Sequence, residues 1–153
     1  MIDDMDDRQQ LADLMNRFLR SVSFEPGGAP RYDELHDLFI PGGILIKAGS
    51  DTPEISTVDE FVRPRQASVD AGELTAFDEV ELAAIVELFG NVAHRFSTYR
   101  KRGTLNGTPI DVLGAIATQF LRTPDGWRIT SMAWDDERPG VELPESYRAT
   151  TPV

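Results

Sequence analysis

Residues 89–103 read FGNVAHRFSTYRKRG, and this stretch joins two long strands through a tight turn. The segment before the turn, Glu79–Phe89, is long and largely apolar. The segment after it, Val92–Arg102, reads as a strand whose alternate side chains point to opposite faces. Gly90-Asn91 between them is typical of a two-residue β-hairpin loop. The stretch therefore predicts an antiparallel pair of strands.

Two further turns extend this pair into a meander. Residues 103–108 (GTLNGT) and 123–126 (TPDG) are typical turn sequences, and strands are predicted after them at Ile110–Arg122 and Trp127–Asp135. Each of these strands is roughly ten residues or longer, well above the usual five or six. Long neighbouring strands twist strongly, so the sheet is expected to curl.

The sequence before the meander has helical periodicity. Apolar residues fall at the spacing of one helix face, and they are Leu11, Leu14, Met15, Phe18 and Val22. Acidic residues from Asp3 to Asp7 precede this stripe, where negative charge favours the start of a helix. A first amphipathic helix is therefore predicted, and residues 25–30 (EPGGAP) are expected to end it.

Two shorter helices and a short strand are expected next. Tyr32, Leu35 and Phe39 stand at helical spacing, and residues 41–43 (PGG) should stop that helix. Residues 43–48 (GILIKA) predict a short strand. Residues 57–60 (TVDE) form a capping-box pattern that opens a third helix to about residue 71, and Pro64 should kink this helix or remove a hydrogen bond.

Helices followed by a meander predict an α+β fold with the helices gathered on one face of the sheet. A length of 153 residues suits one domain over residues 1–153. Its core is expected at about residues 8–140, with residues 138–153 as a tail over the surface.

Composition excludes several classes of function. The chain has no cysteine, so disulfides, thiolate metal sites and cysteine nucleophiles are absent. The net charge of −11 would repel nucleic acid, and the basic run at residues 99–102 (YRKR) is interpreted as a solvated strand end. No apolar run is long enough to cross a membrane, and the acidic N-terminal sequence is unlike a signal peptide, so a cytoplasmic protein is expected.

The segments Phe89–Gly103 and Asp125–Gly140 (DGWRITSMAWDDERPG) resemble the SnoaL-like branch of the nuclear transport factor 2-like superfamily, whose fold is also called cystatin-like. The resemblance covers roughly residues 8–140. It implies a curved antiparallel sheet packed on three N-terminal helices around a cone-shaped cavity, and a homodimer through the outer face of the sheet. It implies no single activity, because the superfamily includes isomerases, dehydratases, cyclases and binding modules.

Within such a cavity, three residues are candidates for acid–base catalysis. His94 shares a strand face with Val92 and Phe96 and could act as a general acid or base. Asp136 ends the last strand, in a position similar to the cavity carboxylate of related isomerases and cyclases. Tyr99 could donate a hydrogen bond to a ligand carbonyl. Each has a structural alternative: a buried or interface histidine, a solvated strand end paired with Arg138, and a tyrosine on the sheet surface.

Four further residues are candidates for a ligand pocket, namely Tyr32, Phe96, Gln119 and Trp134. Gln119 lies in an apolar strand and could equally contact a second subunit, and Gly114 in the same strand could mark a bulge or bend. The two histidines, His36 and His94, have no metal-binding spacing, and no cofactor motif is present, so no metal and no cofactor are expected.

Two functional hypotheses follow. The first is a cofactor-independent isomerase, cyclase or dehydratase that transfers protons on a small hydrophobic carbonyl compound. The second is a non-catalytic homodimer that binds a small ligand or a protein. The version of the first hypothesis in which His94 and Asp136 act together requires both to lie on the same face of the sheet.

Overall fold

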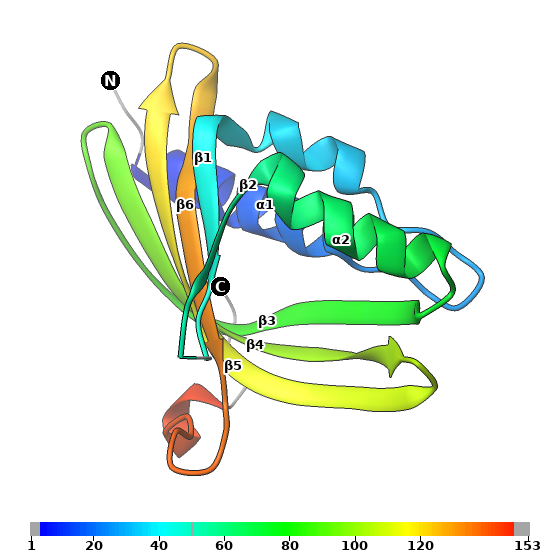
Figure 1. The fold of residues 1–153 in the computed structure, drawn as a ribbon. Helices are drawn as coiled ribbons and strands as arrows, with labels where there is room; N and C mark the ends of the chain where they lie inside the picture. Colours follow the sequence, from blue (N-terminus) through cyan, green and yellow to red (C-terminus); the bar gives the residue numbers. More distant parts are fainter. Residues whose placement is uncertain (1–3, 50, 149–153) are drawn as a thin grey trace.

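A curved six-stranded sheet organises the chain, and its strands follow the order β2-β1-β6-β5-β4-β3 (Figure 1). The strands are β1 (Phe39–Lys47), β2 (Glu54–Thr57), β3 (Leu74–Phe89), β4 (Val92–Leu105), β5 (Thr108–Thr123) and β6 (Gly126–Asp136). The computed structural model describes residues 4–49 and 51–148. The expectations for Asp3 and for residues 149–153 of the tail concern residues outside the described ranges.

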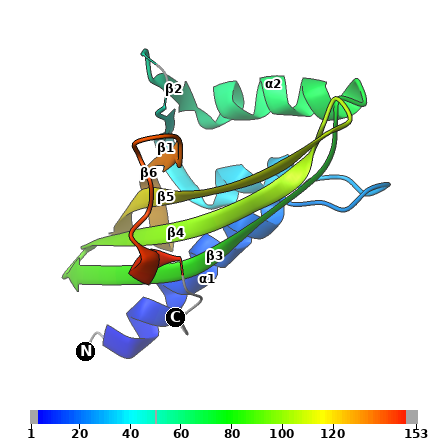
Figure 2. The same ribbon diagram turned by 90° about the horizontal axis from the view of Figure 1, so that it is seen from below.

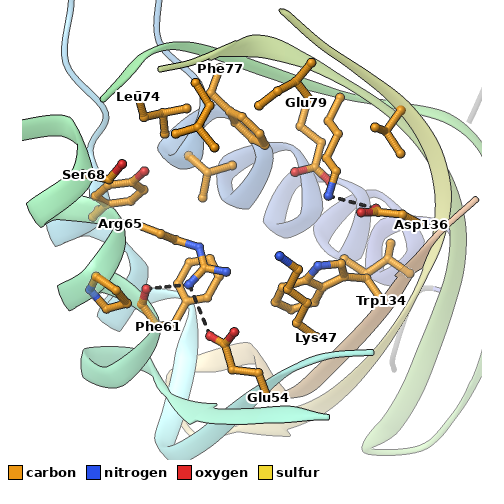
Figure 3. A pocket seen from close by; sticks show the side chains of 18 of the residues that line it. Lys47, Glu54, Phe61, Arg65, Ser68, Leu74, Phe77, Glu79, Trp134 and Asp136 are labelled. Atoms are coloured by element: carbon orange, nitrogen blue, oxygen red, sulfur yellow. Dashed lines mark hydrogen bonds and ion pairs between the residues drawn. The ribbon is translucent and has the colours of Figure 1, made fainter. Parts of the chain in front are cut away.

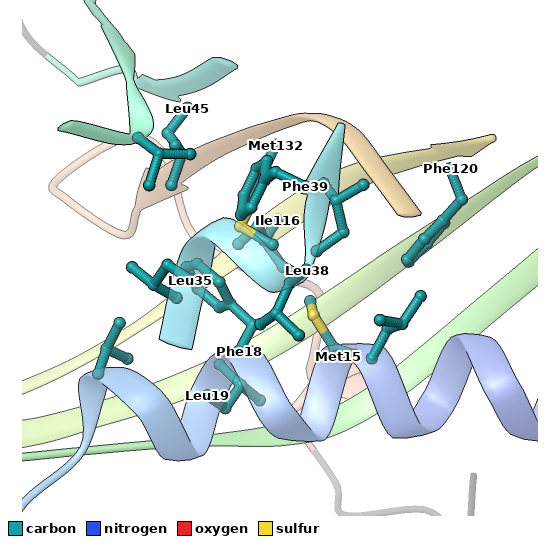
Figure 4. Packing of buried hydrophobic residues seen from close by; sticks show 14 of the residues in the cluster. Met15, Phe18, Leu19, Leu35, Leu38, Phe39, Leu45, Ile116, Phe120 and Met132 are labelled. Carbon is teal, nitrogen blue, oxygen red and sulfur yellow. The ribbon is translucent and has the colours of Figure 1, made fainter. Parts of the chain in front are cut away.

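The helices pack on one face of the sheet, which we call the inner face (Figure 2). They are α1 (Asp4–Val22), the 3-10 helix η1 (Tyr32–Asp37) and α2 (Val58–Asp70). The stripe predicted for α1 is buried throughout, and it packs with η1 and the inner face into one apolar core (Figure 4). The α+β fold with helices on one face is therefore confirmed. No helix within the described ranges is long and apolar enough to cross a membrane.

The predicted capping box starts α2. The Glu60 amide donates to Thr57 Oγ1 at 3.2 Å, and the Thr57 amide donates to Glu60 Oε1 at 3.0 Å, so each residue satisfies a free donor of the other. The helix continues through Pro64 to Asp70. It packs on the same face of the sheet as α1 (Figure 1).

The first strands differ from the prediction. β1 begins at Phe39 and continues through residues 41–43, which were expected to form a helix stop, with an irregularity between Phe39 and Ile44. β1 also pairs in parallel with β6, so the sheet is mixed, while its other strand pairs are antiparallel. The short β2 was not predicted. Local patterns missed the parallel pairing because β6 is distant in sequence from β1, and β2 has only four residues, too few to show a clear alternation.

Single extra residues interrupt the alternation of two strands. Thr75 and Leu82 have no partner in the β3–β4 register, and Thr130 has none in the β5–β6 register. A one-residue bulge moves every later side chain to the opposite face. Because of the bulge at Thr130, Trp127 and Ile129 lie buried on the inner face, whereas strict alternation along β6 would place them on the face of Asp135.

The described part of the C-terminal tail folds back onto the outer face. Its short 3-10 helix η2 (Glu145–Tyr147) accepts a hydrogen bond from Thr98 Oγ1 at the Tyr147 carbonyl, at 2.8 Å. Glu137 accepts hydrogen bonds from the Leu143 amide and from the Arg148 guanidinium. These contacts cover Thr98 in the middle of β4.

Candidate functional site

A pocket of about 460 Å³ lies between the inner face, α1 and α2 (Figure 3). Its volume is within the range of small-molecule sites. Most of its lining is apolar, and the apolar residues include Phe18, Val22, Phe61, Leu74, Phe77, Ile116 and Trp134. A few charged groups, which include Lys47, Glu54, Arg65, Glu79, Lys101 and Asp136, point into this apolar space. The combination suits a ligand with an apolar body and few polar groups.

One wall of the pocket carries a hydrogen-bonded cluster around Asp136. Tyr99 Oη donates to Asp136 Oδ1 at 2.5 Å, and Lys101 Nζ lies 2.8 Å from the same oxygen. Tyr99 Oη also contacts the Asp135 carbonyl oxygen at 3.1 Å. Burial and the neighbouring Asp136 carboxylate raise the pKa of Tyr99, so its hydroxyl stays protonated and serves as a donor.

Gly114 allows Tyr99 to reach Asp136. Tyr99 is on β4 and Asp136 on β6, so the phenol must cross the intervening strand β5 at Gly114, its register partner. A β-carbon at Gly114 would overlap the Tyr99 hydroxyl. The glycine expected to mark a bulge or bend instead provides space for a side chain to pass.

Glu79 places a second carboxyl group beside this cluster. It lies directly opposite Lys101 in the β3–β4 register and faces the same pocket. Burial raises the pKa of Glu79 to about 7, and the Asp136 carboxylate adds to the rise, while Lys101 and Arg65 oppose it. A carboxyl group with this pKa can both accept and release a proton near neutral pH.

The facing wall carries the cation Arg65 on α2. Its guanidinium lies 3.8 Å over the Phe61 ring, and Nη1 donates to the Phe61 carbonyl oxygen at 2.9 Å. Glu54 Oε1 is 3.7 Å away, which is longer than a hydrogen bond. Burial lowers the pKa of Arg65 and raises that of the neighbouring Tyr32.

The candidate site residues predicted from the sequence lie in two places, some at the pocket and others on the outer face of the sheet. Asp136, Tyr32 and Trp134 line the pocket, and Tyr99 bonds to Asp136 at its edge. Asp135, on the other side of β6, pairs with Arg138 at 2.6 Å.

His94, Phe96 and Gln119 lie on the outer face, away from the pocket. His94 is 46% exposed, and its Nε2 contacts Glu87 Oε1 at 2.8 Å. Phe96 and Gln119 are also exposed on this face. The version of the enzyme hypothesis that combines His94 with Asp136 is therefore wrong, because the inner face of β4 is the one that carries Tyr99.

Several charged pocket residues were not predicted from the sequence, among them Lys101, Glu79 and Arg65. Lys101 could have been found, because it alternates with Tyr99 and so shares its face, although the basic run was interpreted as solvated. Glu79 stands at the start of a strand whose predicted role depends only on its apolar residues. Arg65 stands four residues after Phe61 and four before Val69, so helical spacing places it on the apolar face of α2.

No group of His, Cys, Asp or Glu within residues 4–49 and 51–148 is arranged to hold a metal ion. Both histidines make exposed contacts with single carboxylates, His36 with Asp59 and His94 with Glu87. The charged groups of the pocket are better placed for proton transfer and for binding an organic ligand.

Solved structures of other proteins share this fold, whereas no protein-family model and no curated protein sequence matches the chain. A nuclear transport factor 2-like superfamily protein from Salmonella enterica is 16% identical, with a TM-score of 0.70 over 88% of this chain and 93% of that one. A protein with a cystatin-like fold from Novosphingobium aromaticivorans is 17% identical, with a TM-score of 0.66 over 97% and 91%. A nuclear transport factor 2-like protein from Cytophaga hutchinsonii is 13% identical, with a TM-score of 0.66 over 85% and 98%. The chain therefore has the nuclear transport factor 2-like, cystatin-like fold, which is the fold that the resemblance of its hairpin sequence implies.

Proposed function

We propose that this protein is a cofactor-independent enzyme of the SnoaL-like type, an isomerase, cyclase or dehydratase that transfers protons on a small hydrophobic carbonyl compound. The observation that carries the proposal is Glu79, a carboxyl group with a pKa of about 7 that faces an apolar pocket. Burial makes this carboxylate more basic than a solvated one, and a catalytic base works best when its pKa is near the operating pH.

In this proposal Glu79 removes a proton from the carbon next to the substrate carbonyl. Negative charge then develops on the carbonyl oxygen, which accepts a hydrogen bond from the Lys101 ammonium beside Glu79. Asp136 holds this ammonium in position, and Tyr99 fixes Asp136. Protonated Glu79 returns its proton to another carbon in an isomerisation, or to a departing hydroxyl group in a dehydration.

Proton exchange tests this role without knowledge of the natural substrate. We would incubate simple ketones such as tetralone with the protein in deuterium oxide and follow loss of the α-proton signal by NMR. Glu79→Gln should slow the catalysed exchange by about a hundredfold or more. Glu87→Gln is the matched control, because Glu87 is an exposed carboxyl on the outer face, and it should exchange like the wild type. Exchange that is absent, or equal in Glu79→Gln and wild type, would contradict the proposal.

The second candidate function is a non-catalytic homodimer that binds a small ligand or a protein. The observation in its favour is an apolar patch on the outer face, formed by Ile85, Phe89, Val92, Phe96 and Leu121, all of which are exposed. Exposed apolar patches on a sheet face commonly mark protein interfaces. We include a homodimer through this patch in both proposals, and the exchange experiment decides between them.

A further inference from the structure

We infer that the ligand of this pocket is a small organic carboxylate with an apolar body, and that Arg65 and Lys47 bind its carboxylate. The inference rests on the pocket of the proposed function being the ligand site, and it names the substrate class. Arg65 comes from α2 and Lys47 from the end of β1. Their charged groups point toward one another across the pocket (Figure 3). The two cations repel each other, and an anion bound between them would be attracted by both.

Arg65 is already arranged as a carboxylate receptor. The Phe61 ring and carbonyl oxygen hold its guanidinium in place, and the side chain is 25% exposed. One of its nitrogens is used by the Phe61 carbonyl, and the Glu54 contact is too long for a hydrogen bond. The remaining N–H groups of the planar guanidinium can bind a carboxylate with two parallel hydrogen bonds.

The acidic groups of the pocket leave hydrogen-bonding capacity on both cations, although Glu54 forms a 3.7 Å ion pair with Arg65 and is the register partner of Lys47. Asp136 is engaged by Lys101 and Tyr99 on the sheet wall. Glu54 is about half exposed and makes only the loose contact with Arg65. Lys47 has no ion pair with any residue of the described ranges, although the whole chain carries a charge of −11. A ligand carboxylate can supply the short hydrogen bonds that the carboxylates of the pocket do not make to Arg65 and Lys47.

The space between the cations and Glu79 defines the rest of the ligand. Phe61 and Trp134 meet edge to face there at 5.9 Å between ring centroids, and Phe77 adds a third ring to the lining. Aromatic walls suit a flat aromatic or alicyclic body. A carboxylate at Arg65 and Lys47 would place such a body across the aromatic rings, with its carbonyl toward Glu79 and Lys101.

Calorimetry with a matched pair of unreactive probes tests the inference. Naphthylacetate and naphthylacetamide have nearly the same shape, and they differ in charge at one group. The carboxylate should bind at least about tenfold more tightly than the amide, as expected for charged hydrogen bonds. Arg65→Met and Lys47→Met should each remove most of this preference. Arg63→Met is the matched control, because Arg63 is an exposed arginine of the same helix outside the pocket, and it should keep the preference.

The inference would be overturned if the two probes bind with equal affinity or if neither binds. It would also be overturned if Arg63→Met loses as much of the carboxylate preference as Arg65→Met does. Lys47 is exposed, so Lys47→Met tests the idea even if Arg65→Met disturbs folding. Glu79→Gln should retain the carboxylate preference while losing proton exchange. A retained preference without any exchange activity would therefore refute the proposed enzyme and leave the carboxylate site standing.

Discussion

Replacing Glu79 by glutamine should stabilise the protein above about pH 7 and change its stability little below about pH 4.5. Glu79 has its pKa raised from 4.5 to about 7 in the folded state. Between these values the unfolded chain has released the proton and the folded chain has kept it, so wild-type stability falls as the pH rises through this window. Glutamine cannot ionise and avoids this loss.

The size of the effect follows from the same shift. One pKa unit corresponds to about 1.4 kcal/mol, so the rise from 4.5 to about 7 means that ionising Glu79 in the folded state costs at most about 3.5 kcal/mol. The side chain retains partial contact with solvent, which screens the charge. We therefore expect Glu79→Gln to raise the free energy of unfolding by about 1–3 kcal/mol above pH 7.

Urea unfolding at a series of pH values, followed by tryptophan fluorescence, measures this difference. Asp78→Asn is the control, because Asp78 is the neighbouring carboxyl on the outer face and makes only a 3.9 Å exposed contact with Arg102. It removes the same charge from the chain and should shift stability by less than about 1 kcal/mol. A difference between Glu79→Gln and wild type that does not vary with pH, or that favours wild type above pH 7, would refute the raised pKa.

Three other changes test separate parts of the structure. Gly114→Ala should lower the free energy of unfolding by about 1–3 kcal/mol, because the new methyl group overlaps the Tyr99 hydroxyl. An unchanged melting temperature would contradict the passage of the Tyr99 side chain over Gly114. Asp7→Asn should destabilise the protein, because it breaks the buried contact of Asp7 with Arg122 at 2.7 Å. Arg122 lowers the pKa of Asp7, so the wild-type advantage should be complete above about pH 4, and disappear in urea unfolding as the pH falls below that; a constant advantage would argue against the ion pair. Phe96→Glu should convert a dimer into a monomer in sedimentation velocity, and a monomeric wild type would remove the proposed interface.

The elements of the fold could be predicted where the decisive signal is local. The Thr57–Glu60 capping box and the apolar stripe of α1 involve residues within one or a few turns. The Gly90-Asn91 turn connects strands that touch each other directly. Parallel pairing of β1 with β6 could not be predicted in this way, because some 80 residues of chain separate the two strands.

The candidate site was predictable in part for a related reason. Alternation along β4 determines that Tyr99 and Lys101 share one face and that His94 lies on the other. It does not determine which face the helices cover, so residues of both faces, Tyr99 on one and His94 and Phe96 on the other, were candidates for the pocket. The raised pKa of Glu79 could not be predicted either, because it arises from burial among residues of several elements.

The sequence by itself determined the order of helices and strands, the hairpins, and which side chains of an uninterrupted strand lie together. These properties depend on backbone preferences and on a two-residue period, both of which act over short distances. Only the tertiary structure decided which face is inside, because that depends on where α1 and α2 pack. It also decided where the unpaired residues Leu82 and Thr130 reverse the alternation, and that Gly114 lets Tyr99 reach Asp136. The pocket chemistry arises from these long-range contacts, since a carboxyl group becomes a base near neutral pH only when distant parts of the chain exclude water from it.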